Sequence, residues 1–374
     1  MKLSCIKIVC IKCVILLILA LFIPTLSLAD TYSPHVTARA AVLIEANSGK
    51  ILFEKNSHKP LYPASTTKVI TAILGLELGD IEEIAIISRN AANVGEASIY
   101  LRENQQVYLN DLIKGALIKS GNDASYAIGE HIAGNEAIFL MIMNKKAAII
   151  GAENTSFHNT NGLPNEKHLS SAHDLALIGR YAMNNELFAQ YVQIKEYRLE
   201  FVSGEVRNIK NTNRLLQNYP YATGIKTGTT KAAGQCLISS AQRDGKELIA
   251  VVLGSYARYA DVINLFEYGF RNWNIYTLSK DTSIGDIEIR NGHEDLLNLY
   301  LARSVTEVYP RNSNFIVKKN IPEYIEAPVL EGTELGMLEI YIDDIKIQTI
   351  PIIAGADIKR LSIIEKLQRI FSKN

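Results

Sequence analysis

The sequence is poor in cysteine, and most of the cysteine it has lies at one end. Of its 374 residues only four are cysteines, and three of them fall within the first thirteen positions. Beyond these only Cys236 remains, which excludes an internal disulfide and a cysteine-based zinc site in the rest of the chain. That part must therefore be stabilised by its hydrophobic core.

An excess of one charge sign and a long apolar span are missing as well. Lys and Arg together number 39, as do Asp and Glu, so no net positive charge favours binding to nucleic acid. With 23 glycines and 10 prolines, the chain is neither fibrous nor low in complexity. A hydrophobic share of 48% with 21% charged residues is typical of a globular protein and excludes intrinsic disorder. A polytopic membrane protein is excluded too.

Residues 1–29 have the pattern of a secretory signal peptide. Three lysines charge its first part, an apolar run of eleven residues follows at 13–23, and small residues stand at 27 and 29. Eleven residues are too few to span a bilayer comfortably. We therefore expect cleavage after Ala29 and export, which leaves 36 basic against 39 acidic side chains.

Between residues 39 and 273, strands open and close the pattern and helices fill its middle. Residues 39–56 predict two strands around a turn at 47–49. Apolar residues recur with helical spacing at 65–79, 109–119, 122–133, 136–150 and 171–184. Strand-like segments return at 195–202 and 235–254, before a helix at 258–271. This order predicts an α+β fold with an antiparallel sheet.

After Trp273 the pattern changes to short strand-like runs separated by turn residues, which predicts a small all-β sandwich over 276–355. It holds no cluster of catalytic residue types, so no chemistry is assigned to it.

The last segment, 356–374, predicts an amphipathic helix. At about 100° per residue, Lys359, Lys366, Arg369 and Lys373 gather on one side and aliphatic residues cover much of the rest. A basic amphipathic helix can lie in a membrane interface, or it can dock on the protein's own surface. The pattern leaves both interpretations open.

A Ser-x-x-Lys motif, Ser65-Thr66-Thr67-Lys68, begins the helical pattern of 65–79. If a helix starts there, Ser65 lies at its N-terminus and Lys68 follows one turn later on the same face. A serine hydroxyl becomes a good nucleophile when a nearby base takes its proton, and a lysine can do so when burial and positive neighbours lower its pKa. Serine and threonine are also common N-caps, and the motif by itself favours that role.

Two more short motifs follow. Ser120-Gly121-Asn122 stands between two helical segments, where a hydroxyl and an amide can point into a cleft or cap a helix. Lys226-Thr227-Gly228, with Thr229 next, precedes the strand expected near Cys236, so we expect it at the edge of the sheet. An ammonium group and hydroxyls suit a substrate carboxylate, the alternative being a polar strand end.

Each motif alone is weak evidence, but the three in this order form the signature of penicillin-binding proteins and serine β-lactamases. The sequence resembles serine-type D-alanyl-D-alanine carboxypeptidases, the low-molecular-mass penicillin-binding proteins of peptidase family S11. The resemblance covers about residues 36–273 and includes AAVLIEANSGKILFEKN, YPASTTKVITA and NYPYATGIKTGTTKAAGQCL. More loosely, 276–355 and 356–374 resemble the family's C-terminal β domain and membrane anchor.

The resemblance implies a β-lactamase/transpeptidase-like catalytic domain at 30–275, in which a helical subdomain accompanies the antiparallel sheet. Ser65 would attack the carbonyl of the penultimate D-Ala, form an acyl-enzyme and release the terminal D-Ala. Lys68 would act as general base, Ser120 would carry the proton to the leaving amine, and Asn122 would hold the substrate amide. Water would then hydrolyse the ester.

The same resemblance implies a substrate-binding set of Lys226, Thr227, Gly228 and Thr229. Lys226 would keep Lys68 neutral and attract the terminal carboxylate, with Arg258 as a further candidate for that role. The backbone N–H groups of Ser65 and Thr229 would form the oxyanion hole. No cofactor or metal is implied. The partners are the peptidoglycan pentapeptide stem, β-lactams as covalent inhibitors and a membrane surface, on the periplasmic side of the cytoplasmic membrane.

Other chemistry is weighed on four residues. His158, His168 and His173 invite a metal or Ser-His-Asp site, but the resemblance makes this region structural, with surface or capping histidines. Glu166 suggests a serine β-lactamase as an alternative function, although the residues around it lack the asparagine of the Glu-x-x-Leu-Asn motif. A DD-endopeptidase and a non-catalytic cell-wall-binding protein remain as further alternatives.

Overall fold

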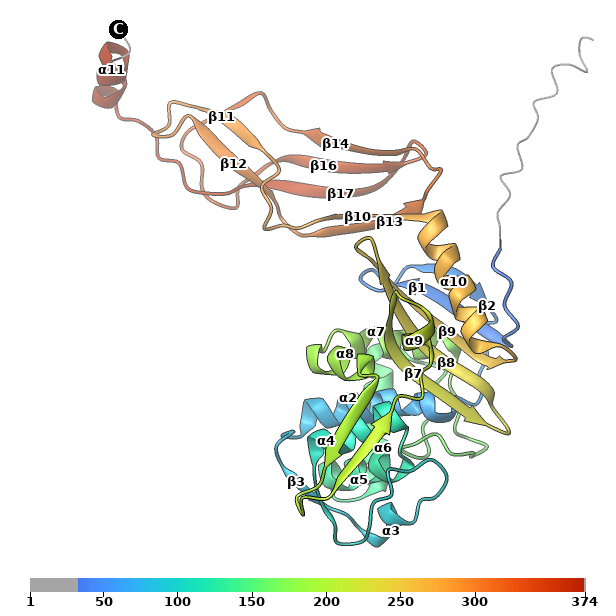
Figure 1. Cartoon of the computed structure of the whole chain (residues 1–374). Coiled ribbons are helices and arrows are strands. Elements are labelled where there is room, and N and C mark those ends of the chain that lie inside the picture. The colour runs from blue at the N-terminus through green and yellow to red at the C-terminus, as the bar shows by residue number, and fades with distance from the viewer. Residues whose placement is uncertain (1–32, 373–374) are drawn as a thin grey trace, which may run out of the picture. The chain divides into compact units, whose positions relative to one another are not determined.

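The computed structural model describes residues 33–372, so the expected signal peptide lies outside the described residues. A five-stranded antiparallel sheet organises the first part of the chain (Figure 1). Its order is β2-β1-β9-β8-β7, built from β1 (Ala40–Glu45), β2 (Ile51–Lys55), β7 (Ala222–Thr230), β8 (Gly234–Arg243) and β9 (Lys246–Ser255). The expected hairpins at 39–56 and 235–254 are both confirmed. The α+β prediction is confirmed with them.

Alternate residues of the central strands face two separate cores. Val42 and Ile44 of β1 belong to a core with the helical region, whereas Ala41 and Leu43 belong to a second core. The helical region consists of α2 (Lys68–Leu78), α4 (Leu109–Lys114), α5 (Asn122–Ala133), α6 (Glu136–Ile150), α7 (Ala172–Met183) and α8 (Glu186–Gln193). The second core is closed by α10 (Arg258–Asn272) and the short α9 (Leu215–Asn218). All six residues of β1 are buried, as expected for a strand covered on both faces.

Local capping explains where several helices begin. Asn135, Ser171 and Asn185 stand just before α6, α7 and α8, and each side chain accepts a hydrogen bond from the backbone N–H three residues later. These bonds satisfy donors that the first helical turn leaves unpaired. The expected helices at 136–150 and 171–184 therefore agree with the structure to within a residue.

Short elements complete the helical side of the fold. They are η1 (Ala64–Thr67), β3 (Ile84–Ile86), α3 (Arg89–Ala92), β4 (Gln106–Tyr108), η2 (Gly115–Lys119), β5 (Glu196–Glu200) and β6 (Val206–Lys210). Two of them refine the predicted helices: 65–79 starts as a 3-10 turn, and 109–119 ends as a π-helical turn. The Lys-Thr-Gly motif lies within edge strand β7 rather than before a strand, a correction to the predicted layout.

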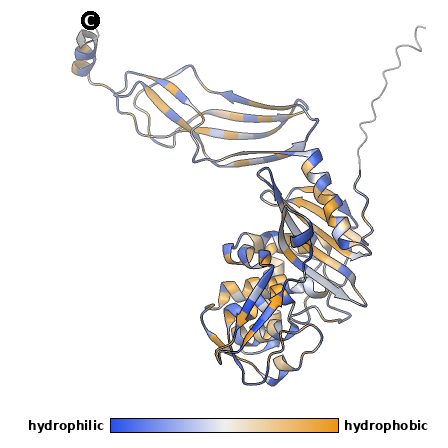
Figure 2. Cartoon of the chain, in the orientation of Figure 1, coloured by the Kyte–Doolittle hydropathy of each residue, from blue (hydrophilic) through white to orange (hydrophobic). Residues whose placement is uncertain are grey.

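The region after the first sheet is all-β, as predicted. Its strands are β10 (Trp273–Leu278), β11 (Asp286–Arg290), β12 (Leu296–Leu301), β13 (Val305–Pro310), β14 (Phe315–Asn320), β15 (Tyr324–Glu326), β16 (Glu334–Ile342) and β17 (Ile345–Ala354). Six of them form a sheet in the order β14-β16-β17-β12-β11-β15, and β10 pairs with β13. Figure 2 shows hydrophobic and hydrophilic residues alternating along these strands, the period expected when one face covers a core.

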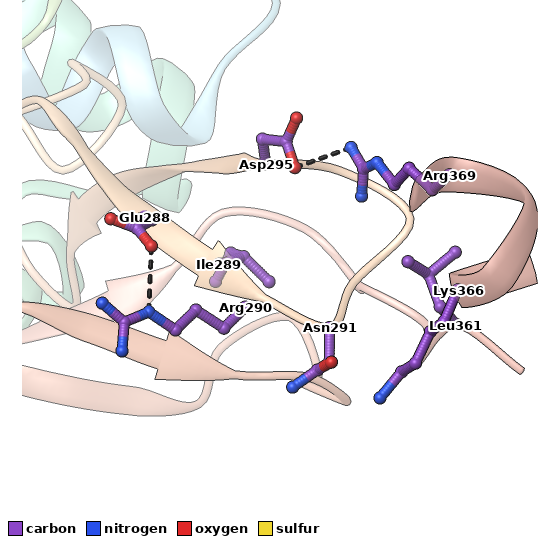
Figure 3. A pocket seen from close by; sticks show the side chains of 8 residues that line it. All are labelled: Glu288, Ile289, Arg290, Asn291, Asp295, Leu361, Lys366 and Arg369. Carbon is purple, nitrogen blue, oxygen red and sulfur yellow. Dashed lines mark hydrogen bonds and ion pairs between the residues drawn. The ribbon is translucent and has the colours of Figure 1, made fainter. Parts of the chain in front are cut away.

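A short helix, α11 (Ile363–Ser372), follows the sheet. Arg369 pairs with Asp295 at 2.6 Å, beside a cavity of about 490 Å³ between α11 and the β11–β12 turn (Figure 3). Ile363, Ile364 and Leu367 of the same helix are 79%, 69% and 51% exposed. Within residues 33–372, none of the helices has the length and apolar character needed to cross a membrane.

Replacing Gly179 of α7 by alanine is expected to destabilise the sheet–helix packing, although alanine favours helices. A Cβ there would lie 2.9 Å from the Ile238 side chain of β8, so the helix must shift or the core must strain. We expect the free energy of unfolding to fall by about 1–3 kcal/mol. Thermal melting of the wild type and Gly179→Ala measures this, and an unchanged or higher midpoint would contradict the packing.

Candidate active site

The first two candidate residues meet in the turn that leads into α2. Ser65 lies in η1 and Lys68 begins α2, and the Lys68 Nζ donates a hydrogen bond to the Ser65 hydroxyl at 3.0 Å. The backbone spacing of three residues in a helical turn places both side chains on one face. The expected pairing of hydroxyl and amine is therefore present.

The Lys68 ammonium group is fully buried. Its Nζ also donates to the Asn122 Oδ1 at 2.7 Å and to the Asn161 carbonyl at 2.6 Å. Burial lowers the pKa of Lys68 well below its usual value, and the positive charge of Lys226 lowers it further. Such an amine exists as a neutral base at a lower pH than an exposed lysine.

The Ser-Gly-Asn motif joins the π-helical turn to α5. Ser120 ends η2 with φ of +67°, and Asn122 is the first residue of α5. The Asn122 Nδ2 donates to the Gly95 carbonyl at 3.0 Å, which leaves one amide hydrogen for a ligand. Ser120 is buried. Among the described residues its hydroxyl has no hydrogen-bond partner, so it is not bonded to Lys68.

Edge strand β7 runs directly against the turn that carries Ser65. A Cβ at Gly228 would lie 2.9 Å from the Ser65 backbone nitrogen and 3.0 Å from the Pro63 carbonyl oxygen. Only glycine permits this approach without displacing backbone. The close neighbour of Gly228 is thus the backbone of the Ser65 turn.

Lys226 is buried beside this strand, with 1% of its surface exposed. Burial, with the charge of Arg258 as a smaller cause, lowers the pKa of Lys226 to about 7. Its Nζ donates to the Thr227 carbonyl at 3.0 Å, and the Thr227 hydroxyl is bonded to the Thr212 hydroxyl at 2.8 Å.

Arg258, the first residue of α10, reaches the same strand. Its Nη1 donates to the Thr229 hydroxyl at 2.8 Å and to the Gly228 carbonyl at 2.9 Å. Arg258 and Thr229 line a cavity of about 380 Å³ together with Arg214 and Tyr259. The structure therefore gathers cationic and hydroxyl groups at the end of β7, the arrangement that binds a carboxylate.

Sequence reasoning missed a second segment that packs against the Ser65 turn, at residues 161–162. Gly162 has φ of +87°, and a Cβ there would lie 1.8 Å from the Ala64 carbonyl oxygen. The Asn161 carbonyl just before it accepts the bond from Lys68. The signal for this contact was the Asn-Gly pair at 161–162, a turn signal that by itself says nothing about which element the turn touches.

His168 corrects the expectation of surface or capping histidines. It is 1% exposed, its Nε2 is 2.8 Å from the Thr67 hydroxyl, and its Nδ1 accepts from the His158 N–H at 3.0 Å. Burial lowers the pKa of His168 to about 4, so the ring is neutral near pH 7. Because Nδ1 accepts, the proton lies on Nε2.

Within residues 33–372, none of the remaining acid–base candidates is hydrogen-bonded to Ser65 or Lys68. His158 and Glu166 are exposed, and His173 lies 3.6 Å from Asp174. Glu166 makes no hydrogen bond or ion pair within the part of the chain that the structure describes. No group of three His, Cys, Asp or Glu residues in residues 33–372 is placed to hold a metal ion.

Comparisons with known proteins match both the first sheet-and-helix region and the all-β region of the chain. A family model for D-alanyl-D-alanine carboxypeptidase matches residues 28–257, and one for the C-terminal domain of penicillin-binding protein 5 matches residues 274–360. The chain is 34% identical to the D-alanyl-D-alanine carboxypeptidase DacF of Bacillus subtilis, over 89% of this chain and 88% of that one. It is 32% identical to DacC of Escherichia coli, over 91% and 90%.

The fold has solved counterparts. Penicillin-binding protein 5 from Haemophilus influenzae superposes with a TM-score of 0.71 at 27% identity, over 88% of this chain and 99% of that one. The Streptomyces K15 DD-transpeptidase matches with a TM-score of 0.61 at 29% identity, over 64% of this chain and 99% of that one. By its catalytic and C-terminal regions alike, the chain belongs to the D-alanyl-D-alanine carboxypeptidase family of serine hydrolases.

Proposed function

We propose that the chain removes the terminal D-Ala from peptidoglycan pentapeptide stems through an acyl-enzyme on Ser65. The observation that carries this proposal is the buried Lys68 Nζ at 3.0 Å from the Ser65 hydroxyl, with its pKa lowered by burial and by Lys226. A hydroxyl beside a neutral amine is an activated nucleophile. Trimming of stems would limit cross-linking of the wall and so influence cell shape.

We infer the chemical steps from the Lys68–Ser65 contact together with the roles that the family resemblance implies. Neutral Lys68 takes the Ser65 proton while the hydroxyl oxygen attacks the carbonyl of the penultimate D-Ala. The negative oxygen then forms at the backbone N–H groups of Ser65 and Thr229, where preorganised donors lower the barrier. Ser120 carries a proton to the leaving amine, the C–N bond breaks, and water later cleaves the ester. The free Asn122 amide hydrogen holds the substrate amide.

The end of β7 receives the terminal carboxylate. Lys226 supplies buried positive charge, and Thr229 and Arg258 already share a hydrogen bond at the cavity there. The Thr227 hydroxyl is partnered by Thr212, so its role is the more indirect. Gly228 keeps the strand against Ser65. A β-lactam carries an analogous carboxylate and acyl carbonyl, and would acylate Ser65. Glu166 is exposed and its side chain has no partner in the described part of the chain, which gives no support to β-lactamase deacylation.

We further propose the division into a signal peptide at 1–29, a catalytic domain at 30–275, a β domain at 276–355 and an anchor helix at 356–374. The exposed Ile363, Ile364 and Leu367 favour membrane contact over docking on the protein's own surface, because docking would cover the apolar residues. Instead the ion pair of Arg369 with Asp295 faces the β domain. The protein would then be exported and held peripherally at the membrane, on its periplasmic side.

Ser65→Ala is expected to abolish acylation while the fold persists. The intact mass of residues 30–374 should rise with penicillin for the wild type and stay constant for the variant, and D-Ala release should fall by about 1,000-fold or more. The exposed Ser203→Ala is the matched control and should label normally. Normal labelling of Ser65→Ala would contradict the nucleophile, and wild-type labelling that decays rapidly would indicate a β-lactamase.

The pH dependence of kcat/KM for D-Ala release is expected to be bell-shaped. The rate rises with pH as Lys68 loses its proton and becomes a base, since its pKa is lowered. It falls as Lys226, whose pKa is about 7, loses the charge that attracts the carboxylate. Lys226→Arg keeps its charge at high pH, so its alkaline limb should move upward. An alkaline limb unmoved in Lys226→Arg would assign that limb to another group.

Removing the apolar face of α11 should release the protein from membranes. Sedimentation with phosphatidylglycerol–phosphatidylcholine vesicles is expected to weaken about tenfold or more when Ile363, Ile364 and Leu367 are changed to glutamine, because that apolar surface no longer enters the interface. Deleting 356–374 should act alike. The control changes Ile345 and Ile347 of β17, 66% and 44% exposed, to glutamine. Equal sedimentation of all variants would refute the anchor.

A further inference from the structure

The hairpin formed by β5 and β6 touches a loop that leads to the active site. Arg207 of β6 donates from its Nη1 to the carbonyl oxygens of both Ile99 and Tyr100, in the loop between α3 and β4. Glu205 holds the same guanidinium through Nε at 3.0 Å and Nη2 at 2.6 Å. The Phe201 ring packs against it at 4.5 Å. Contacts within the hairpin thus hold the Arg207 guanidinium in place, independently of its bonds to the loop.

The other side of this loop is bonded to the Ser-Gly-Asn motif. The Asn122 N–H donates to the Ala97 carbonyl at 2.7 Å, and its Nδ2 donates to the Gly95 carbonyl at 3.0 Å. The neighbouring Asp123 carboxylate accepts from the N–H groups of Ile99 at 3.1 Å and Leu101 at 3.0 Å. The loop therefore lies between the hairpin and the residues next to Lys68.

Ile99 and Tyr100 show why the loop needs an outer contact. Ile99 is 1% exposed, and a Cβ at Gly115 or Gly121 would lie 2.8 or 3.3 Å from its side chain. Tyr100 is 70% exposed with φ of +63°, a backbone conformation unfavourable for any residue but glycine. Two bonds hold that conformation: the Tyr100 N–H donates to the Ser98 hydroxyl at 2.6 Å, and the Tyr100 carbonyl accepts from Arg207 on the outer side of the loop.

The position of this loop decides which end of the Asn122 amide faces Lys68. With Nδ2 bonded to Gly95, the Oδ1 accepts from the Lys68 Nζ at 2.7 Å. If the Gly95 carbonyl moved away, the amide could rotate and present its NH₂ group to the lysine, because both ends have similar size. The NH₂ group would then donate to the lone pair that neutral Lys68 needs as a base, and the base and the substrate-binding amide would both be misplaced.

We propose that Arg207 is a positioning residue of the active site, which holds the 95–101 loop so that the Asn122 amide keeps its orientation toward Lys68. Glu205 supports Arg207 in this role and also pairs at 3.3 Å with Arg102, the residue that follows this loop. The proposal rests on the proposed function, since it acts through Asn122 in acylation.

The test compares penicillin acylation rates of the full 30–374 chain with Arg207 or its support changed. Arg207→Ala is expected to acylate about 100-fold more slowly, the scale of a reacting group displaced by about 1 Å. If Arg207→Ala fails to fold, Glu205→Gln replaces it in the test. This variant keeps the guanidinium but weakens the bonds that hold it, and should slow acylation to a smaller extent. The matched control is Arg198→Ala on β5, since the Arg198 side chain is exposed and makes no hydrogen bond or ion pair among the described residues.

A double-mutant cycle separates positioning from general loss of stability. In an Asn122→Ala background, Arg207→Ala should change the acylation rate by less than about twofold, because the amide it positions is absent. Equal rates for Arg207→Ala and Arg198→Ala, or effects of Arg207→Ala and Asn122→Ala that multiply, would overturn the proposal. A wild-type chain that never labels would instead contradict the proposed function itself.

Discussion

The contact on which the site depends is that between edge strand β7 and the turn η1. Gly228 lets the strand backbone approach the Ser65 nitrogen so closely that no larger residue fits. Gly162 approaches the same turn as closely, since a Cβ there would lie 1.8 Å from the Ala64 carbonyl oxygen. Two glycines from distant parts of the chain thus hold one turn between them, and the hydroxyl, the base and the carboxylate receptor take their positions from it.

This contact places like charges together where water is scarce. Lys68 and Lys226 are both buried, and the charge of Arg258 lies near Lys226. Burying ammonium groups is costly, so the protein either neutralises them or surrounds them with acceptors. Lys68 has the Asn122 and Asn161 oxygens in place of a carboxylate. The result is an amine that loses its proton easily and lies beside a hydroxyl, while Lys226 and Arg258 supply positive charge on the substrate side.

The supports of this site lie well outside its three motifs. The His168 Nε2–H donates to the Thr67 hydroxyl, and the Thr67 hydroxyl in turn donates to the Ala64 carbonyl at 2.9 Å. Asp123 and the 95–101 loop hold the Ser-Gly-Asn turn from behind. Backbone carbonyls accept several of these bonds, so the identity of the residue that offers the carbonyl matters less than where its chain segment runs. In the C-terminal region, α11 is likewise held by a contact from another segment. Its Arg369 pairs with Asp295, while its apolar residues remain exposed.

The sequence by itself determined the α+β class, the all-β region and the hairpins at 39–56 and 235–254, because hydrophobic periodicity and turn residues act over short distances. It also singled out Ser65, Lys68, Asn122 and Lys226, whose types and order carry the family signature. Only the tertiary structure decided that Lys-Thr-Gly lies inside a strand, that His168 is buried, and that Asn161, Gly162 and Gly95 face the site. These features depend on close contacts between segments that lie tens of residues apart in the sequence. A local sequence pattern does not indicate which distant segments will touch.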